Sequence, residues 1–202
     1  MVNMDNSIPS TNLERKTQIL DAAIGVFGRF GFKKTSVDDL AKAAKLSKQG
    51  LYLHFTSKEE IFTAAIRKYL SDGLRRVEQE LSNENAMLLD RLAGAMDAWF
   101  GRHIETFDRA ALDVIDAGDH LSPAEINEYK TAFRVRIASS LASDAEFKSL
   151  QTACSSKEIA EVLFRFGLTW KEPQTTRAEF SKSVRLCVRA CCQLKETKKG
   201  KS

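Results

Sequence analysis

Two helix-start signals only ten residues apart restrict the fold of this chain more than any other feature. They lie in the stretch SKQGLYLHFTSKEE, residues 47–60, where Ser47 and Ser57 each precede a run of helix-forming residues. Serine is a preferred N-cap because its hydroxyl accepts an amide N–H of the first turn. The second signal, Ser57 to Glu60, also has the form of a capping box, flanked by Phe55 and Ile61 as a hydrophobic staple. A helix of only about two turns fits between the signals, and a helix this short is marginal unless neighbouring elements hold it.

A helical projection at about 100° per residue divides residues 48–55 into two faces. Leu51 and Phe55 lie one turn apart and face inward with Leu46. The other side carries residues that a buried helix does not need, namely Gln49, Gly50 and Leu53, with Tyr52 and His54 on the flanks. The sequence therefore predicts a short helix that presents an apolar side chain and a glycine to solvent.

The residues before this segment predict a helix-turn-helix. A first helix is expected from near Asn12 to Gly31, and Ser36 with Asp39 predicts the start of a second. The second helix ends about three residues before the short one, as in motifs whose second helix enters a DNA major groove.

In such a motif each unusual residue of the short helix has a use. Gln49 can contact a base edge, Leu53 a thymine methyl group, and Gly50 leaves room for the duplex. Phosphate contacts are predicted for Lys48, Tyr52, His54 and Lys58. The alternative is an ordinary helical hairpin with an exposed leucine and tyrosine.

The rest of the chain is also predicted to be helical. Only three prolines and ten glycines interrupt 202 residues, and few stretches alternate with a period of two. The long helix from Ser57 should run through residue 81. Further helices are expected near 86–107, 109–118, 123–142, 157–171 and 176–194, nine in all, separated by SNEN, Asp108, GDHLSP, SDAEF and KEPQ.

The charge is unevenly distributed, although the net charge is only +4. Residues 1–70 carry 11 Lys and Arg against 7 Asp and Glu, residues 71–161 carry 10 against 17, and residues 162–202 carry 10 against 3. The basic first region is suited to a polyanion, whereas the −7 of the middle region weakly favours a cationic or neutral ligand there.

Several protein classes are disfavoured. No apolar run approaches the roughly 18 residues that span a bilayer, and the first residues do not resemble a signal peptide, so a cytoplasmic protein is expected. The cysteines Cys154, Cys187, Cys191 and Cys192 are mostly bunched, which favours packing over a disulfide framework or a metal site. No phosphate loop, H-E-x-x-H or G-x-S-x-G motif is present, so no catalytic residue, metal or cofactor is predicted.

The stretch from Thr35 to Phe62 resembles the DNA-binding domain of tetracycline-repressor (TetR/AcrR) family transcriptional regulators. The residues that carry the resemblance are Thr35, Ser36, Leu40, Ala41, Ser47, Leu51, Tyr52, His54, Phe55 and Lys58. The match adds Thr35 and Ser36 to the predicted DNA-binding residues. One departure is Lys45, where the family usually has a glycine in the turn; a left-handed backbone there would cost about 1 kcal/mol.

The resemblance implies that the C-terminal part binds a small effector within a helical bundle and forms a homodimer through its last two helices. Aromatic and polar residues at helical spacing give the candidate pocket: Trp99, His103, Phe107, Tyr129, Phe133, Phe166 and Trp170. The candidate dimer interface consists of Phe164, Leu168, Phe180, Val184, Cys187, Val188 and Cys191.

The sequence thus predicts an all-α protein with four segments. These are a flexible N-terminus (1–11), a three-helix helix-turn-helix DNA-binding domain (12–72), an effector-binding and dimerisation domain (73–194) and a flexible basic tail (195–202). The expected function is that of a homodimeric repressor that a small molecule releases from operator DNA. A helical-bundle enzyme or ligand carrier with an incidental helix-turn-helix, and a ligand-independent architectural DNA binder, remain as alternatives.

Overall fold

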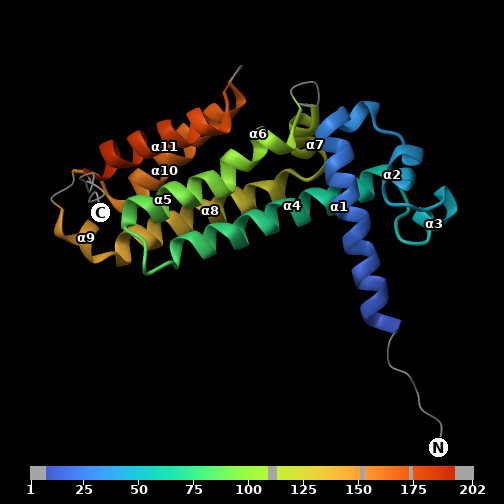
Figure 1. Cartoon of the computed structure of the whole chain (residues 1–202), viewed down its shortest axis with the longest axis horizontal. Coiled ribbons are helices and arrows are strands. Elements are labelled where there is room, and N and C mark those ends of the chain that lie inside the picture. Colours follow the sequence, from blue (N-terminus) through green and yellow to red (C-terminus); the bar gives the residue numbers. More distant parts are fainter. Residues whose placement is uncertain (1–7, 109–112, 151–152, 173–174, 194–202) are drawn as a thin grey trace, which may run out of the picture. The chain divides into compact units, whose positions relative to one another are not determined.

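The computed structural model describes residues 8–108, 113–150, 153–172 and 175–193, and these are helical, as predicted (Figure 1). They form two compact units. The first contains the chain up to Leu70 together with Thr106–Ile126, and the second contains Ser71–Glu105 and the chain from Asn127 onward. The predicted domains, 12–72 and 73–194, did not include the return of Thr106–Ile126 to the first unit. The predicted tail 195–202 and residues 1–7 lie outside the described residues.

The first unit is built from α1 (Ile8–Lys34), α2 (Val37–Ala43), α3 (Lys48–Tyr52), the start of α4 (Lys58–Leu81) and α7 (Asp113–Leu121). Helix α1 begins four residues before the predicted Asn12. Its core is a cluster of buried apolar residues that all these helices share: Ile19, Ala23, Phe27, Leu40, Ala41, Ala44, Leu51, Phe55, Ile61, Phe62, Ala65 and Val114. The rings of Phe27 and Phe62 meet edge to face, with centroids 5.0 Å apart.

Gly31 ends the regular part of α1, as predicted. Its φ of 82° lies in the left-handed region, and a Cβ there would lie 1.9 Å from Oδ1 of Asp113. The other carboxylate oxygen of Asp113 accepts the backbone N–H of Lys33 at 2.9 Å. The missing side chain therefore lets the Asp113 carboxylate lie against the end of α1, and this contact joins α7 to the first unit.

The second unit contains the rest of α4, α5 (Leu88–Met96), a π-helical turn (Asp97–Gly101), most of α6 (Arg102–Thr106) and of α8 (Pro123–Ser143), α9 (Ala145–Ser149), α10 (Ser156–Gly167), a 3-10 turn (Leu168–Lys171) and α11 (Arg177–Cys192). Helix α11 packs against both α5 and α10. Buried aromatic rings fill the interior, where Trp99 stacks on Phe133 at 5.3 Å and Phe100 meets Phe164 at 5.6 Å.

Two predicted breaks are present but much shorter than expected. The stretch GDHLSP was expected to be a loop, but α7 continues to Leu121 and α8 begins at Pro123. Proline is accepted there because its missing N–H falls in the first helical turn. The stretch SDAEF contains α9, which starts because the carboxylate of Asp144 accepts the N–H of Phe147 at 3.0 Å. The prediction of nine helices is therefore too simple for the described residues.

Across the ranges that the structure describes, no helix combines the length and the apolar character needed to cross a membrane.

Candidate nucleic-acid interface

The turn between α2 and α3 is a Schellman motif centred on Lys45. The N–H of Leu46 donates to the carbonyl of Ala41 at 2.9 Å, and the N–H of Lys45 donates to that of Lys42 at 3.1 Å. Lys45 has a φ of 54°, so the backbone adopts the left-handed conformation that a glycine would favour. The left-handed backbone that was expected at Lys45, where the resembled family usually has a glycine, is therefore present.

We expect Lys45→Gly to raise the free energy of unfolding by up to about 1 kcal/mol, because it relieves the left-handed strain. The gain is reduced by the greater freedom of glycine in the unfolded chain. Urea denaturation of the wild type and the variant measures the difference, with Lys42→Gly in α2 as the matched control that should lose stability. A Lys45→Gly protein less stable than the wild type would contradict this explanation of the turn.

Helix α3 is held as predicted by its cap and its buried face. The hydroxyl of Ser47 accepts the N–H of Gly50 at 3.0 Å, and Leu51 and Phe55 are buried in the core of the first unit. On the other side, Leu53 is 85% exposed and Tyr52 is 46% exposed. The predicted inward and outward faces are therefore confirmed.

Gly50 has a structural role besides the one predicted. A Cβ at this position would lie 3.3 Å from Oγ of Ser47 and 3.4 Å from Cδ2 of Leu46. Both contacts are tight, so the glycine also lets the start of α3 approach its own cap. Gln49 and Gly50 remain on the outer side of the helix, exposed and half-buried respectively.

Three residues predicted to contact DNA have partners within the protein. The ammonium of Lys58 donates to the carbonyls of Phe32 and Thr35, both at 3.1 Å, and lies 4.3 Å from the centroid of the Phe32 ring. Thr35 is buried, and its hydroxyl donates to the carbonyl of Gly31 at 2.6 Å. Both side chains thus complete the end of α1 in this structure. Lys48 forms an exposed ion pair with Asp38 at 3.2 Å, which leaves it accessible.

Ser36 and Ser57 act as helix caps. The Ser36 hydroxyl accepts the N–H of Asp39 at 3.1 Å, and the Asp39 carboxylate accepts both the N–H and the hydroxyl of Ser36, which lowers the pKa of Asp39. Ser57 accepts the N–H of Glu60 at 3.1 Å, but the Glu60 carboxylate accepts from Thr56 instead of closing the predicted box with Ser57. The predicted start of α4 holds, whereas its capping pattern is shifted by one residue.

The predicted pocket residues lie in two different places. Trp99 stacks on Phe133, and His103 lies 4.8 Å from Trp170 between ring centroids, all within the second unit. Phe107 instead packs on Tyr69 in the first unit. Tyr129 and Phe166 are half-buried. Three cavities of about 480, 540 and 220 Å³ in the second unit are lined by other residues.

His103 is a buried imidazole that stays neutral. Burial, with the nearby charges of Arg102 and Lys171, lowers its pKa to about 3. Protonation therefore favours the unfolded chain, in which histidine has a pKa of about 6.5. The stability contributed by neutral His103 is present above about pH 6.5 and is lost as the pH falls towards the folded value.

Between pH 7 and pH 5 we expect this group to remove about 2 kcal/mol from the free energy of unfolding. His103→Gln should lose correspondingly less stability over the same interval, because it carries no titrating imidazole. The exposed His120, changed to Gln, is the control and should behave as the wild type. Chemical denaturation at the two pH values gives the comparison, and equal pH dependence in all three proteins would refute the assignment.

The predicted dimer residues divide by exposure. Within the single chain Phe164, Phe180, Val184 and Val188 are already buried, so they hold α10 and α11 to their own unit. Leu168 is exposed, and Cys187 and Cys191 are half-buried with sulfur atoms 3.9 Å apart. Val162 and Leu186, which were not predicted, are exposed apolar residues on α10 and α11. Burial raises the pKa of the Cys187 and Cys192 thiols to about 12, which leaves little reactive thiolate.

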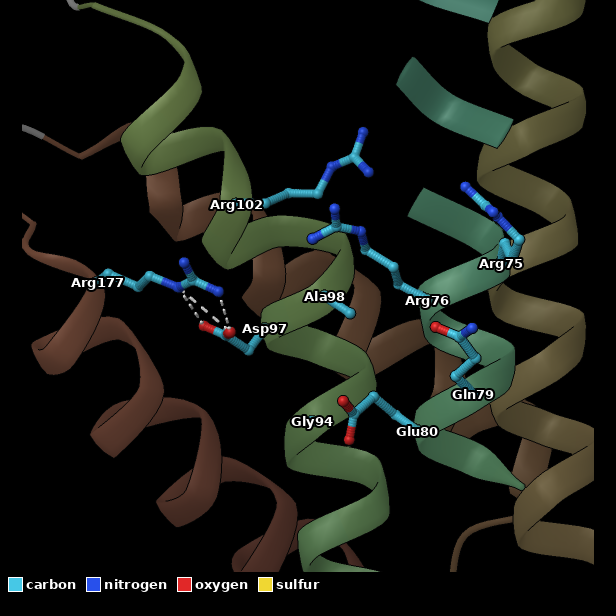
Figure 2. Close-up of a pocket in the computed structure, with 9 residues that line it drawn as sticks. All are labelled: Arg75, Arg76, Gln79, Glu80, Gly94, Asp97, Ala98, Arg102 and Arg177. Atoms are coloured by element: carbon cyan, nitrogen blue, oxygen red, sulfur yellow. Dashed lines mark hydrogen bonds and ion pairs between the residues drawn. The ribbon is translucent and has the colours of Figure 1, made fainter. Parts of the chain in front are cut away.

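Sequence reasoning also missed a group of arginines around the 480 Å³ cavity, which Figure 2 shows. Arg75 and Arg76 are adjacent on α4, Arg102 begins α6, and Arg177 begins α11. The available signal was the Arg-Arg pair two and three residues after Gly73 in the middle of a long helix. Among the described residues, no group of three or more His, Cys, Asp or Glu is arranged to hold a metal ion.

Comparison with known proteins agrees with the architecture of the first unit. The family model described as "Bacterial regulatory proteins, tetR family" matches residues 19–65, which run from α1 through α3 into α4. The chain is 32% identical to the uncharacterized HTH-type transcriptional regulator YfiR of Bacillus subtilis over 122 residues, 60% of this chain and 53% of that protein.

Two further relatives have assigned regulatory roles. The HTH-type transcriptional activator FasR of Mycolicibacterium smegmatis is 32% identical over 136 residues, 66% of this chain and 58% of FasR. IcaR of Staphylococcus aureus, the negative transcriptional regulator of the biofilm operon icaADBC, is 34% identical over 77 residues, 38% of this chain and 41% of IcaR. The chain thus spans about half the length of these curated relatives.

Solved structures share the fold over most of the chain. A putative TetR-family regulator from Mesorhizobium loti has a TM-score of 0.67 at 20% identity, covering 90% of this chain and 96% of that one. The regulator FadR from Bacillus subtilis, solved in complex with stearoyl-CoA, has a TM-score of 0.63 at 18% identity, covering 84% and 95%. Together with the helix-turn-helix geometry, the family match and these relatives show that residues 19–65 are a DNA-binding domain of the TetR family of helix-turn-helix transcriptional regulators, and the solved structures show that the rest of the chain shares the fold.

Proposed function

We propose that this protein is a homodimeric repressor that binds operator DNA through α3 and is released by a small-molecule effector in its second unit. The observation that carries the proposal is the outer face of α3. Leu53 is 85% exposed there beside Gln49, while Ser47 and Leu51 fix the helix from the other side. A rigid helix with an exposed apolar and an amide side chain suits base contacts in a major groove.

Phosphate contacts are assigned to the residues around α3 that remain accessible. Lys48 is exposed, Tyr52 is partly exposed, His54 is half-buried, and Lys45 adds a positive charge in the preceding turn. Lys58 has a supporting role, since its ammonium joins α4 to the end of α1. A regulator that acts on the chromosome of a bacterium works in the cytoplasm, which is the proposed location.

A dimer is proposed through α10 and α11. These helices pack against each other and carry the exposed apolar residues Val162 and Leu186, and Leu168 is exposed in the 3-10 turn that follows α10. A second copy that covers these side chains by twofold symmetry would form a four-helix arrangement. The two α3 helices would then be presented about one DNA turn, or a multiple of it, apart.

Helix α4 provides a direct connection between DNA binding and effector binding. It begins at Lys58, a few residues after α3 ends at Tyr52 and directly after its cap Ser57. Its later residues Arg75, Arg76, Gln79 and Glu80 line the 480 Å³ cavity. Its 24 residues correspond to about 36 Å. A ligand that favours a different tilt of this helix changes the spacing of the two α3 helices, which DNA tolerates only at matching grooves.

The relatives support regulation without fixing its sign. FasR is named an activator and IcaR a negative regulator, and FadR was crystallised with stearoyl-CoA. We propose release by effector, with a coupling free energy of roughly 1–3 kcal/mol that DNA and ligand exert on each other equally. Equal ligand affinity with and without saturating operator would rule out this coupling.

Selection of duplexes from a random pool tests the DNA-binding part. The expected result is an inverted repeat whose half-sites lie one helical turn or a multiple apart. Enrichment of a single asymmetric half-site would argue against the dimer. Turnover of a small molecule without any enriched duplex would favour the alternative of a helical-bundle enzyme or carrier.

A further inference from the structure

The 480 Å³ cavity of the second unit is lined mainly by charged side chains (Figure 2). Among its nine lining residues are four arginines and two acids: Arg75, Arg76, Arg102, Arg177, Glu80 and Asp97. Its local charge is therefore +2, opposite in sign to the −7 of residues 71–161 as a whole. Charges that line a cavity act on its contents more strongly than distant screened charges, so the lining decides which ligand is favoured.

One side of the cavity is neutralised internally. Nη2 of Arg177 lies 2.7 Å from a carboxylate oxygen of Asp97, and Nε of Arg177 donates to both oxygens of that carboxylate. The hydroxyl of Ser181 donates to Asp97 as well, at 3.2 Å, and Arg177 also pairs with Glu105. The hydrogen bonds with Asp97 raise the pKa of Arg177 above its ordinary value. This pair forms a fixed wall. On the α4 side Arg75 is also paired, with Asp72 at 2.6 Å, and Arg76 and Arg102 supply the other two positive charges of the lining.

Arg102 lies against the part of α4 that carries Gly73 and Arg76. A Cβ on Gly73 would lie 2.8 Å from Nη1 of Arg102 and 3.0 Å from its Cζ, so the buried Arg102 guanidinium rests on the surface that this glycine leaves open. Arg76 follows Gly73 by about one helical turn and is exposed. Within the part of the chain that the structure describes, its side chain forms no hydrogen bond or ion pair. Glycine inside a helix costs about 1 kcal/mol relative to alanine, and here it makes room for a guanidinium.

The local backbone also departs from a regular helix beside the cavity. The π-helical turn Asp97–Gly101 contributes Asp97 and Ala98 to the lining, and Arg102 follows it directly. Such turns insert a residue into an α-helix and are frequent at functional sites. Here the turn joins α5 to α6, which begins with Arg102.

We propose that this cavity binds a small polyanion, a phosphate ester or a di- or tricarboxylate, between Arg76 and Arg102. Guanidinium groups bind such oxyanions through paired N–H donors, and Gln79 adds an amide donor to the lining. Only Gly94 and Ala98 among the lining residues lack polar side chains, so a long apolar chain is not favoured. The inference names the ligand class of the proposed effector site and rests on the proposed function for its regulatory meaning.

Calorimetric titration of the full chain with pyrophosphate and with citrate tests the site. We expect at least one probe to bind and Arg76→Gln to weaken its binding by about tenfold or more. Lys148→Gln is the matched control, because it removes an exposed positive charge from α9 in the same unit, away from the cavity lining. Gly73→Ala is a second variant, in which the methyl group displaces the Arg102 guanidinium without removing any charge, and it should weaken the same probe.

The pattern of binding decides between the possible sources of the anion. Pyrophosphate alone indicates a phosphate ester, citrate alone a polycarboxylate, and both indicate a general oxyanion site. The proposal is overturned if neither probe binds, if Arg76→Gln binds as the wild type does, or if Lys148→Gln weakens binding as much as Arg76→Gln does. Operator affinity of Arg76→Gln without anion is measured separately, so that loss of the anion site and failure of DNA binding are distinguished.

Discussion

Leu53→Glu is expected to reduce operator affinity by at least about a hundredfold, equivalent to about 2.7 kcal/mol. The side chain is 85% exposed, so the fold loses little when it is changed. A carboxylate at this position would replace an apolar contact with a base and would face the phosphates of both strands. Fluorescence anisotropy with the selected duplex measures the loss, and circular dichroism verifies that the helices remain.

Two variants show whether position 53 itself matters. Leu53→Ala introduces no charge. It should lower operator affinity by about tenfold or less, because only the apolar contact is lost. Val135→Glu adds the same charge at a 57% exposed residue of α8 in the second unit and should leave operator affinity unchanged. If Leu53→Glu bound the operator as tightly as Val135→Glu, α3 would not be the helix that contacts the bases.

Leu186→Glu is expected to convert the dimer to a monomer and to lower operator affinity by about a hundredfold or more. Leu186 is 64% exposed on α11, and a charge there would be buried between two copies without a partner. A monomer contacts only one half-site of the operator. It loses the contact with the second half-site, which in a dimer becomes an intramolecular step once the first half-site is bound. Sedimentation equilibrium and operator titration give the two readouts.

The same Val135→Glu protein is the control and should remain dimeric. Leu186→Glu must also keep its cooperative thermal transition, since the side chain lies outside the buried core. A dimeric Leu186→Glu protein would place the interface elsewhere on the chain. A monomer with undiminished operator affinity would contradict the requirement for two half-sites.

The first unit was largely predictable because local signals and burial agree there. Ser36, Ser47 and Ser57 each cap a helix, and the period of Leu51 and Phe55 places Leu53 outside. The hydrogen-bond partners of a long side chain could not be predicted from the sequence. Lys58 looked like a phosphate contact, but its reach to the carbonyls of Phe32 and Thr35 depends on how α1 ends.

The second unit was less predictable because aromatic periodicity does not distinguish a packed core from a pocket. Trp99 and Phe133 were expected to line a cavity, yet they stack on each other. The lining of the 480 Å³ cavity comes from arginines on separate helices, which are brought together by a glycine and a π-helical turn. Neither feature has a sequence period, so charge averaged over residues 71–161 did not reveal the arginines that gather in this lining.

Operator affinity measured as a function of salt tests the central claim most directly. If α3 docks in a major groove with several phosphate contacts, the logarithm of the binding constant should fall linearly with the logarithm of the salt concentration. The slope should be about −0.9 for each phosphate neutralised, and Lys48→Ala should reduce its magnitude by about one. An affinity that does not change with salt, or no affinity for any duplex that selection returns, would contradict the account.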